Sequence, residues 1–154
     1  GHGVVVDHNV FYNVKDAVVF WNSTRPAERC EMHHNLVVGS YGAAVWSWSP
    51  AEDLKFHHNV VANSNVFWML DEDAKTTFKL SDSMVLGYNE LVQKGGGPAD
   101  LGVKADPKKL NLSEDVVIEK NAKVEMVEDQ TQRNYLHLKP GTIGADLGAG
   151  LFTK

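Results

Sequence analysis

Residues 26–35 read PAERCEMHHN, and residues 50–59 read PAEDLKFHHN. The two stretches begin 24 positions apart and end in the same His-His-Asn triplet. Self-similarity at a fixed spacing indicates a repeat architecture, in which each unit packs on the next one. The shared asparagine is therefore the position on which the rest of the chain can be aligned.

Four copies of one unit emerge from this alignment. The shared residues, at spacings of 26, 24 and 30, are Asn9, Asn35, Asn59 and Asn89. A second apolar run follows in three copies, at residues 17–21, 43–48 and 66–70. These runs are β-branched and aromatic and are bounded by Gly, Asn, Ser and Pro, which is typical of short strands. Helical periodicity is nearly absent before residue 90.

The period and the short strands predict an all-β fold, a parallel β-helix whose equivalent strands stack about 4.8 Å apart. A leucine-rich repeat would be the competing architecture, but no LxxLxL pattern occurs. We expect about four coils over residues 1–94. Residues 95–154 would form irregular final coils and a C-terminal cap of the same domain, with strands at 115–120, 123–128 and 134–139.

Stacking also predicts columns of equivalent side chains. The inward columns should be apolar, and they are Val4/Cys30/Leu54/Met84 and Val6/Met32/Phe56/Leu86. The outward columns are Val5/Glu31/Lys55/Val85 and Asp7/His33/His57/Gly87, and His8/His34/His58/Tyr88 would line the corner. We expect the asparagines at this corner, because Asn tolerates left-handed backbone and can form a ladder of amide hydrogen bonds.

The N-x-apolar bends and the coil length resemble the right-handed parallel β-helix, or pectate-lyase-like, superfamily. The tail segments ADPKKL (105–110) and YLHLKPGTIGADLGA (135–149) are similar to the closing segment of bacterial secreted members. The resemblance implies a right-handed solenoid, the C-terminal portion of such a protein, an extracytoplasmic location and a polysaccharide partner. It implies no single activity, because the superfamily includes lyases, hydrolases, epimerases and binding proteins.

Composition narrows the range of partners. The net charge is −5 and no basic stripe occurs, so we do not expect nucleic-acid binding. No apolar run reaches the roughly 18 residues of a membrane helix. Cys30 is the single cysteine, which excludes an intrachain disulfide. A core strand follows directly after GHG, so we expect a further N-terminal β-helix segment or a partner chain to cover the first coil.

The outward polar columns form the candidate catalytic patch. A polysaccharide lyase needs a base and a cation that holds the uronate carboxylate. The side chains of suitable type are Lys55, His57, His33, Asp7 and Arg29, with Glu31 as a substrate-binding neighbour. The alternative is a surface ion pair between Glu31 and Lys55 beside ordinary surface histidines. Adjacent histidines of one strand should face opposite sides, so neither His-His pair is expected to bind one metal ion.

Aromatic and acidic residues provide further candidates. Trp21, Trp48 and Trp68 could stack on sugar rings, although core packing is the usual role of such residues. Asp71 and Asp73 offer oxygen ligands that would suit calcium, with a solvated turn as the simpler interpretation. No other cofactor is indicated.

Two functions remain open at this point. The first is a polysaccharide-active enzyme, a lyase or part of one, that acts on an acidic glycan. The second is a non-catalytic β-helix module for carbohydrate binding, surface adhesion or assembly. An active site should lie in a groove with a wall, whereas the loops of these coils are short.

Overall fold

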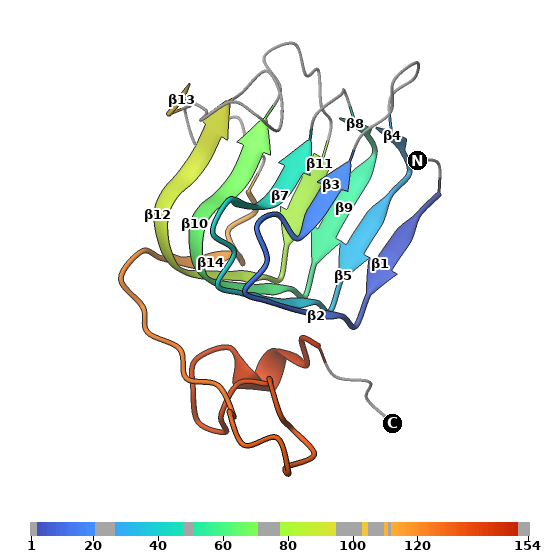
Figure 1. The fold of residues 1–154 in the computed structure, drawn as a ribbon. Helices are drawn as coiled ribbons and strands as arrows, with labels where there is room; N and C mark the ends of the chain where they lie inside the picture. Colours follow the sequence, from blue (N-terminus) through green and yellow to red (C-terminus); the bar gives the residue numbers. More distant parts are fainter. Residues whose placement is uncertain are drawn as a thin grey trace.

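The computed structural model describes residues 3–20, 27–47, 51–70, 78–94, 103–104, 110 and 112–150. Regular structure in these ranges is β, apart from a short 3-10 helix, η2 (Ala145–Leu147). The strands are β1 (Val5–Asp7), β2 (Val10–Tyr12), β3 (Val18–Phe20), β4 (Ala27–Glu28), β5 (Glu31–His33), β6 (Leu36–Val38), β7 (Ala43–Ser47), β8 (Ala51–Glu52), β9 (Leu54–His57), β10 (Val60–Leu70), β11 (Phe78–Ser81), β12 (Met84–Lys94), β13 (Val103–Lys104) and β14 (Val117–Glu119) (Figure 1). No described helix is long and apolar enough to cross a membrane.

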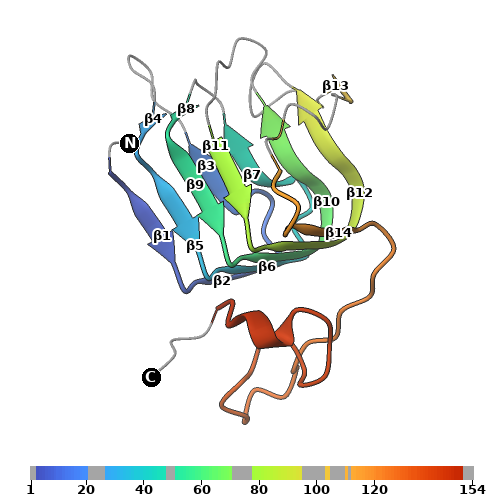
Figure 2. The same cartoon turned by 180° about the vertical axis from the view of Figure 1, so that it is seen from behind.

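Parallel pairing between successive repeats organises the chain. One sheet has the order β1-β5-β9-β11, and a larger one includes β2, β6, β10 and β12 as neighbours. Val5 pairs with Glu31 and Glu31 pairs with Lys55, so each residue lies beside the one a whole repeat later. The strands of the first sheet lie side by side in both views (Figures 1 and 2). The predicted all-β class and parallel stacking are confirmed, and the one antiparallel strand pair described is β12 with β13.

The asparagine column is confirmed in three repeats and wrong in the fourth. Asn35 Oδ1 accepts hydrogen bonds from the Asn9 backbone N–H and Nδ2, at 3.0 and 3.1 Å. Asn59 Oδ1 accepts the same two bonds from Asn35, at 2.9 and 3.0 Å. Ser83, not Asn89, takes the fourth position, because its Oγ accepts the Asn59 N–H at 3.1 Å.

This six-residue shift changes the fourth member of every predicted column. Val60 pairs with Met84, and Leu54 pairs with Phe78, which fixes the register of the fourth repeat. In this register Leu80 follows Phe56 in the inward column, in place of Leu86, and position 78 follows Leu54, in place of Met84. The outward and corner columns end in Lys79, Ser81 and Asp82, and not in Val85, Gly87 and Tyr88.

The left-handed residue at the first corner is the one that precedes the asparagine. His8, His34 and His58 have φ of 53°, 53° and 52°, and Asp82 in the fourth repeat has 45°. The prediction that asparagine adopts this conformation is therefore wrong. The asparagine instead spans the bend with its amide, since Asn35 Nδ2 donates to the His33 carbonyl at 3.0 Å.

A second corner follows at the end of the next strand. Its left-handed positions alternate between two residue types, as Asn13, Gly39, Asn63 and Gly87. A Cβ on Gly39 would lie 3.0 Å from Asn13 Oδ1, and one on Gly87 would lie 2.9 Å from Asn63 Oδ1. Each asparagine side chain therefore lies against a glycine of the next repeat, and the alternation follows from this contact.

Residues 122–150, the C-terminal strap, cross the outer face of the larger sheet. Met126, Leu138 and Ala149 are buried against an apolar surface formed by β6, β10 and β12. Both ribbon views show this segment below the strands (Figures 1 and 2). The strand predicted at 115–120 is confirmed as β14, which pairs in parallel with β12. Those predicted at 123–128 and 134–139 are wrong, because these segments share a single bridge between Met126 and Leu138.

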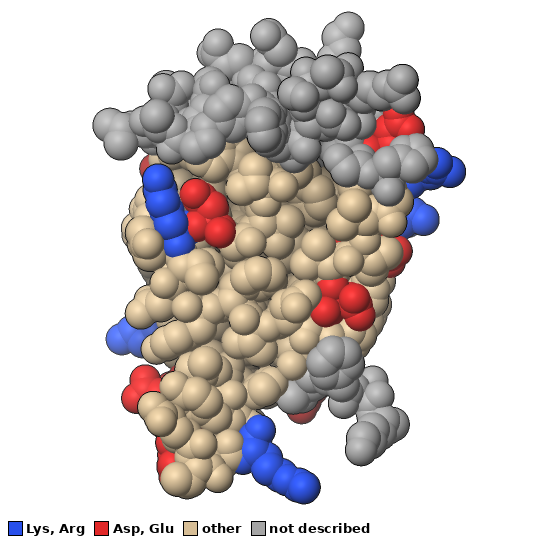
Figure 3. All heavy atoms as spheres, turned by 45° about the vertical axis from the view of Figure 1, so that its right-hand side comes forward, with Lys and Arg blue, Asp and Glu red and all other residues tan. Residues whose placement is uncertain are grey.

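The boundary predicted between residues 94 and 95 adjoins residues 95–102, which lie outside the described residues, and the two-part division stays a prediction. Charged side chains on the described surface in Figure 3 are few and scattered, with a broad uncharged area between them.

Candidate functional site

The predicted catalytic patch comes together on the sheet formed by β1, β5, β9 and β11. Asp7 pairs with His33, and His33 pairs with His57, so the three form one outward column. The imidazoles of His33 and His57 are stacked, with ring centroids 5.1 Å apart and planes 3° apart. Glu31 and Lys55 pair two residues away, and exposed Arg29 lies at the preceding corner with φ of 50°.

The second histidine of each pair belongs to the same surface, which contradicts the expected opposite orientation. His33 Nδ1 lies 2.9 Å from His34 Nδ1, and His57 Nδ1 lies 2.9 Å from His58 Nδ1. Left-handed φ at the corner breaks the alternation of the strand and turns both rings to one side. The result is the imidazole face, five rings in two columns: His33 and His57 beside His8, His34 and His58.

Two carboxylates form hydrogen bonds with histidines of the imidazole face. Asp7 Oδ2 lies 2.7 Å from His8 Nδ1, and Glu31 Oε1 lies 2.6 Å from His57 Nε2. The hydrogen bond from His8 lowers the pKa of Asp7, and the one from His57 lowers the pKa of Glu31. Burial, and then the neighbouring His58 and His8, lower the pKa of His34. The face thus combines ionised carboxylates with a His34 that favours its neutral form.

Proton transfer on this face is restricted by the hydrogen bonds. His57 has Nε2 engaged by Glu31 and Nδ1 engaged by His58, so neither nitrogen is open to a ligand. His33 uses Nδ1 with His34, and its Nε2 has no hydrogen-bond partner among the described residues. Val5 occupies the place in the first repeat that Glu31 occupies in the second. His33 is therefore better placed than His57 to act as a general base.

Metal binding gains no support from this geometry. Within the described ranges, no three or more His, Cys, Asp or Glu side chains are arranged to hold a metal ion. Asp71 and Asp73, the predicted calcium ligands, lie outside the described residues.

Of the three tryptophans predicted as aromatic platforms, the structure describes Trp68, and Trp68 does not supply one. Trp68 is fully buried, and its Nε1 donates to Ser47 Oγ at 2.7 Å. Its ring packs against Phe56 and Phe67 in the core, so the prediction that it contacts a sugar is wrong. Trp21 and Trp48 lie outside the described residues.

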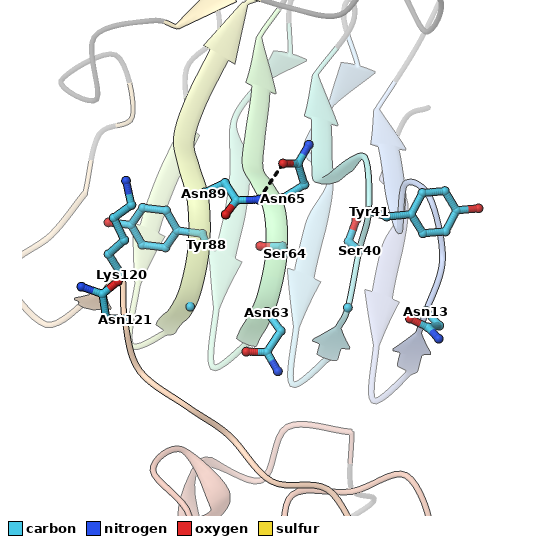
Figure 4. A pocket seen from close by; sticks show the side chains of 12 residues that line it. Asn13, Ser40, Tyr41, Asn63, Ser64, Asn65, Tyr88, Asn89, Lys120 and Asn121 are labelled. Atoms are coloured by element: carbon cyan, nitrogen blue, oxygen red, sulfur yellow. Dashed lines mark hydrogen bonds between the residues drawn. The ribbon is translucent and has the colours of Figure 1, made fainter.

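A different surface, which the sequence prediction missed, forms a groove of about 710 Å³ across the second corner. We call it the amide groove, because asparagines dominate its lining (Figure 4). The described lining residues are Asn13, Gly39, Ser40, Tyr41, Asn63, Ser64, Asn65, Gly87, Tyr88, Asn89, Lys120 and Asn121. They come from successive repeats, so the groove runs across the strands.

The polar groups of the amide groove differ in how far the protein satisfies them. Asn89 Nδ2 donates to Asn65 Oδ1 at 2.9 Å, which joins two neighbouring repeats. Ser64 Oγ is buried and has no hydrogen-bond partner among the residues that the structure describes. At one end of the groove, Tyr41 is 65% exposed. At the other end, the side chain of Tyr88 points toward Lys120 (Figure 4).

The C-terminal strap continues the groove on one side. A second hollow of about 430 Å³ shares Asn13, Gly39 and Asn63 with the amide groove and is lined by strap residues, including Glu125 and Lys139. Lys139 Nζ lies 3.3 Å from Glu125 Oε2. The strap therefore provides the kind of wall that the short loops were not expected to supply.

The sequence contained a signal for this groove. Asn13, Gly39, Asn63 and Gly87 recur at spacings of 26, 24 and 24 residues, but aligning Asn89 with Asn59 moved the last repeat out of register. The chain matches no protein-family model, no curated protein and no solved structure.

Proposed function

We propose that the chain is a right-handed parallel β-helix that binds a polysaccharide in the amide groove. Parallel pairing at intervals of one repeat and the ladder from Asn9 to Ser83 support the β-helix. The resemblance of the bends and tail to the pectate-lyase-like superfamily is in keeping with it. An extracytoplasmic location, as in the bacterial secreted members, is part of the same proposal.

The observation that carries the binding function is the row of amides along a groove that crosses the strands. An Asn side chain offers two N–H donors and an acceptor oxygen, which suits the hydroxyls of a sugar. Tyr41 adds an exposed aromatic ring on which a sugar could stack. A groove that passes over successive repeats fits an extended polymer better than a compact small molecule.

A lyase acting on an acidic glycan is the second candidate, and the open Nε2 of His33 favours it. In this proposal His33 takes the proton from the carbon next to a uronate carboxylate, while Lys55 and Arg29 hold that carboxylate. The bond to the glycosidic oxygen breaks as the carbon–carbon double bond forms, and that oxygen takes a proton from water. Glu31 and Asp7 would orient the surrounding imidazoles through their hydrogen bonds with His57 and His8. The site would be the imidazole face and not the amide groove.

Calorimetric titration with a panel of soluble glycans tests the binding proposal. Tyr41→Ala should weaken binding by up to about tenfold, since an aromatic contact contributes about 0.5–1.5 kcal/mol beyond its area. Tyr41→Phe keeps the ring and should keep most of the affinity. Equal binding by both variants and the parent would refute a role for Tyr41, and no binding to any glycan would refute the function.

The lyase alternative is tested separately, by the ultraviolet absorbance of the unsaturated uronates that a lyase would release. Product should form from an acidic glycan with the parent chain and not with His33→Gln. Absence of product from the parent would remove this alternative and leave the binding function standing.

A further inference from the structure

We propose that the amide groove selects a linear, uncharged glycan ribbon of about four sugars, laid across the strands at about one sugar per strand spacing of 4.8 Å. Successive sugars of this ribbon are turned over, as in chains with diequatorial 1,4 linkages. The inference rests on the proposed function and adds the class, length and orientation of the ligand.

The charge of the groove favours a neutral ligand. Among its described lining residues, Lys120 alone carries a charge, and the others offer amides, hydroxyls, glycine backbone and two phenol rings. An acidic glycan would place a carboxylate on successive sugars, and each desolvated carboxylate needs a cation or several donors. The net charge of −5 adds a long-range repulsion toward a polyanion.

The length of the groove follows from the register of the strands. Asn13, Gly39, Asn63 and Gly87 occupy equivalent places in four successive repeats. Lys120 continues the row, because the Tyr88 N–H donates to its carbonyl at 3.2 Å and Leu86 pairs with Glu119. Five stacked positions enclose four strand spacings, or about 19 Å. A linear pyranose chain advances by roughly one such spacing per sugar, so about four sugars fill the groove.

The alternation of Asn13, Gly39, Asn63 and Gly87 gives this row of the groove a period of two repeats. Asn13 and Asn63 present amides, whereas Gly39 and Gly87, each in the repeat that follows, have no side chain. A ribbon whose successive sugars are turned over presents the same hydroxyl edge on every second sugar, which matches this period. Ser64, whose buried Oγ has no partner in the described part of the chain, lies next to Asn63 and marks a polar position near the middle of the groove.

Titration calorimetry with three series of oligosaccharides, each of two to six sugars, tests the inference on the full chain. The series are uncharged with diequatorial 1,4 links, uncharged with axial–equatorial links, and uronates with diequatorial links. The first series should bind best, with an affinity that rises up to about four sugars and then levels off. Uronates of equal length should bind about tenfold more weakly.

A pair of matched variants tests whether the oligosaccharide binds in the amide groove. Asn63→Asp retains a residue that tolerates the left-handed corner but removes the amide donors, so uncharged ligands should lose about tenfold in affinity. Gln130→Glu makes the same charge change at an exposed position outside the groove lining and should leave binding unchanged. Tighter binding of uronates, or affinity independent of length, would overturn the inference while the proposed function stands. No binding in any series would overturn both.

Discussion

The buried asparagines join the repeats at the level of single residues. Asn35 and Asn59 are both fully buried, and each amide accepts two bonds from the preceding repeat through Oδ1. Each Nδ2 also donates to a strand carbonyl, at 2.8 Å to Val6 for Asn35 and to Met32 for Asn59. A side chain that is both donor and acceptor is needed here, because each unpaired buried polar group costs about 1–3 kcal/mol.

We therefore expect Asn59→Ala to lower the free energy of unfolding by about 2–5 kcal/mol, because it leaves buried groups of Met32 and Asn35 without their partner. Urea denaturation at neutral pH measures this change. Asn9→Ala is the control, since Asn9 is exposed and its amide donates to Asn35 and to the Asp7 carbonyl of its own repeat. An equal loss for both variants would contradict the role of burial in the ladder.

The imidazole face makes stability depend on pH. The pKa of His34 is below its ordinary value of 6.5, so the unfolded chain binds more protons there, and this stability is lost as pH falls below 6.5. The pKa values of Glu31 and Asp7 are also lowered, from 4.5 and 3.8, and their contribution is lost at more acidic pH. All three effects have the same sign, and stability should be greatest above pH 6.5.

Urea unfolding between pH 8 and pH 5 measures this dependence. His34→Asn keeps a residue that tolerates φ of 53° but removes the imidazole, so the loss of stability over this range should be smaller than in the parent. An unchanged pH profile in the variant would show that His34 is not the group that titrates.

The strands and the first three repeats could be predicted from sequence because their columns are chemically uniform. The fourth repeat could not be aligned by residue identity, since Ser83 and Asp82 replace the asparagine and histidine of the earlier copies. These replacements work physically, because a serine hydroxyl accepts the same backbone N–H and aspartate tolerates left-handed φ. The stretch GYN at 87–89 resembles HHN, so residue similarity aligned Asn89, and not Ser83, with Asn59.

The candidate site was predicted in part for a related reason. Asp7, His33, His57, Glu31 and Lys55 share a face because strand alternation is regular up to the corner. The histidine contacts at the corner depend on a positive φ, which the pattern of a strand does not contain. The amide groove lies on the second corner, where turn residues carry no apolar period to align.

A substitution at the second corner tests whether the stability of the fold depends on the close stacking of its turns. Gly87→Ala should lower the free energy of unfolding by about 2–4 kcal/mol, because the new Cβ adds left-handed strain and a clash. That Cβ would lie 2.8 Å from the Ala122 carbonyl oxygen. Thermal and urea denaturation measure the loss.

Gly141→Ala is the matched control, because Gly141 has φ of 83° but nothing within 4 Å of an added Cβ. It should cost about 1–2 kcal/mol from backbone strain alone. A cost for Gly87→Ala no larger than for Gly141→Ala would contradict the close approach of Asn63 and Ala122.

For the molecule as a whole, the C-terminal strap covers an apolar sheet surface and walls the groove. Leu138→Asp places a charge among Leu36, Val60 and Leu86 and should lower the free energy of unfolding by about 3 kcal/mol or more. The released surface should bind a hydrophobic dye. Ile143→Asp is the control, since Ile143 is 38% exposed and should have little effect. Equal dye binding by both variants would contradict the packing of the strap.

The two candidate surfaces lie on different parts of the molecule and carry different chemistry. The imidazole face presents rings and carboxylates on the sheet of β1, β5 and β9, whereas the amide groove presents neutral donors and acceptors on the second corner. A polysaccharide that binds at one of them need not contact the other. Side-chain nuclear magnetic resonance signals distinguish the two surfaces in a single titration.

The most direct test is therefore a titration of the isotope-labelled chain with an uncharged oligosaccharide of about four sugars, the length of the groove. The side-chain amide signals of Asn13, Asn63, Asn65 and Asn89 should shift together, while the imidazole signals of His33 and His57 stay in place. Shifts of the imidazole signals with unchanged asparagine signals would contradict binding in the amide groove.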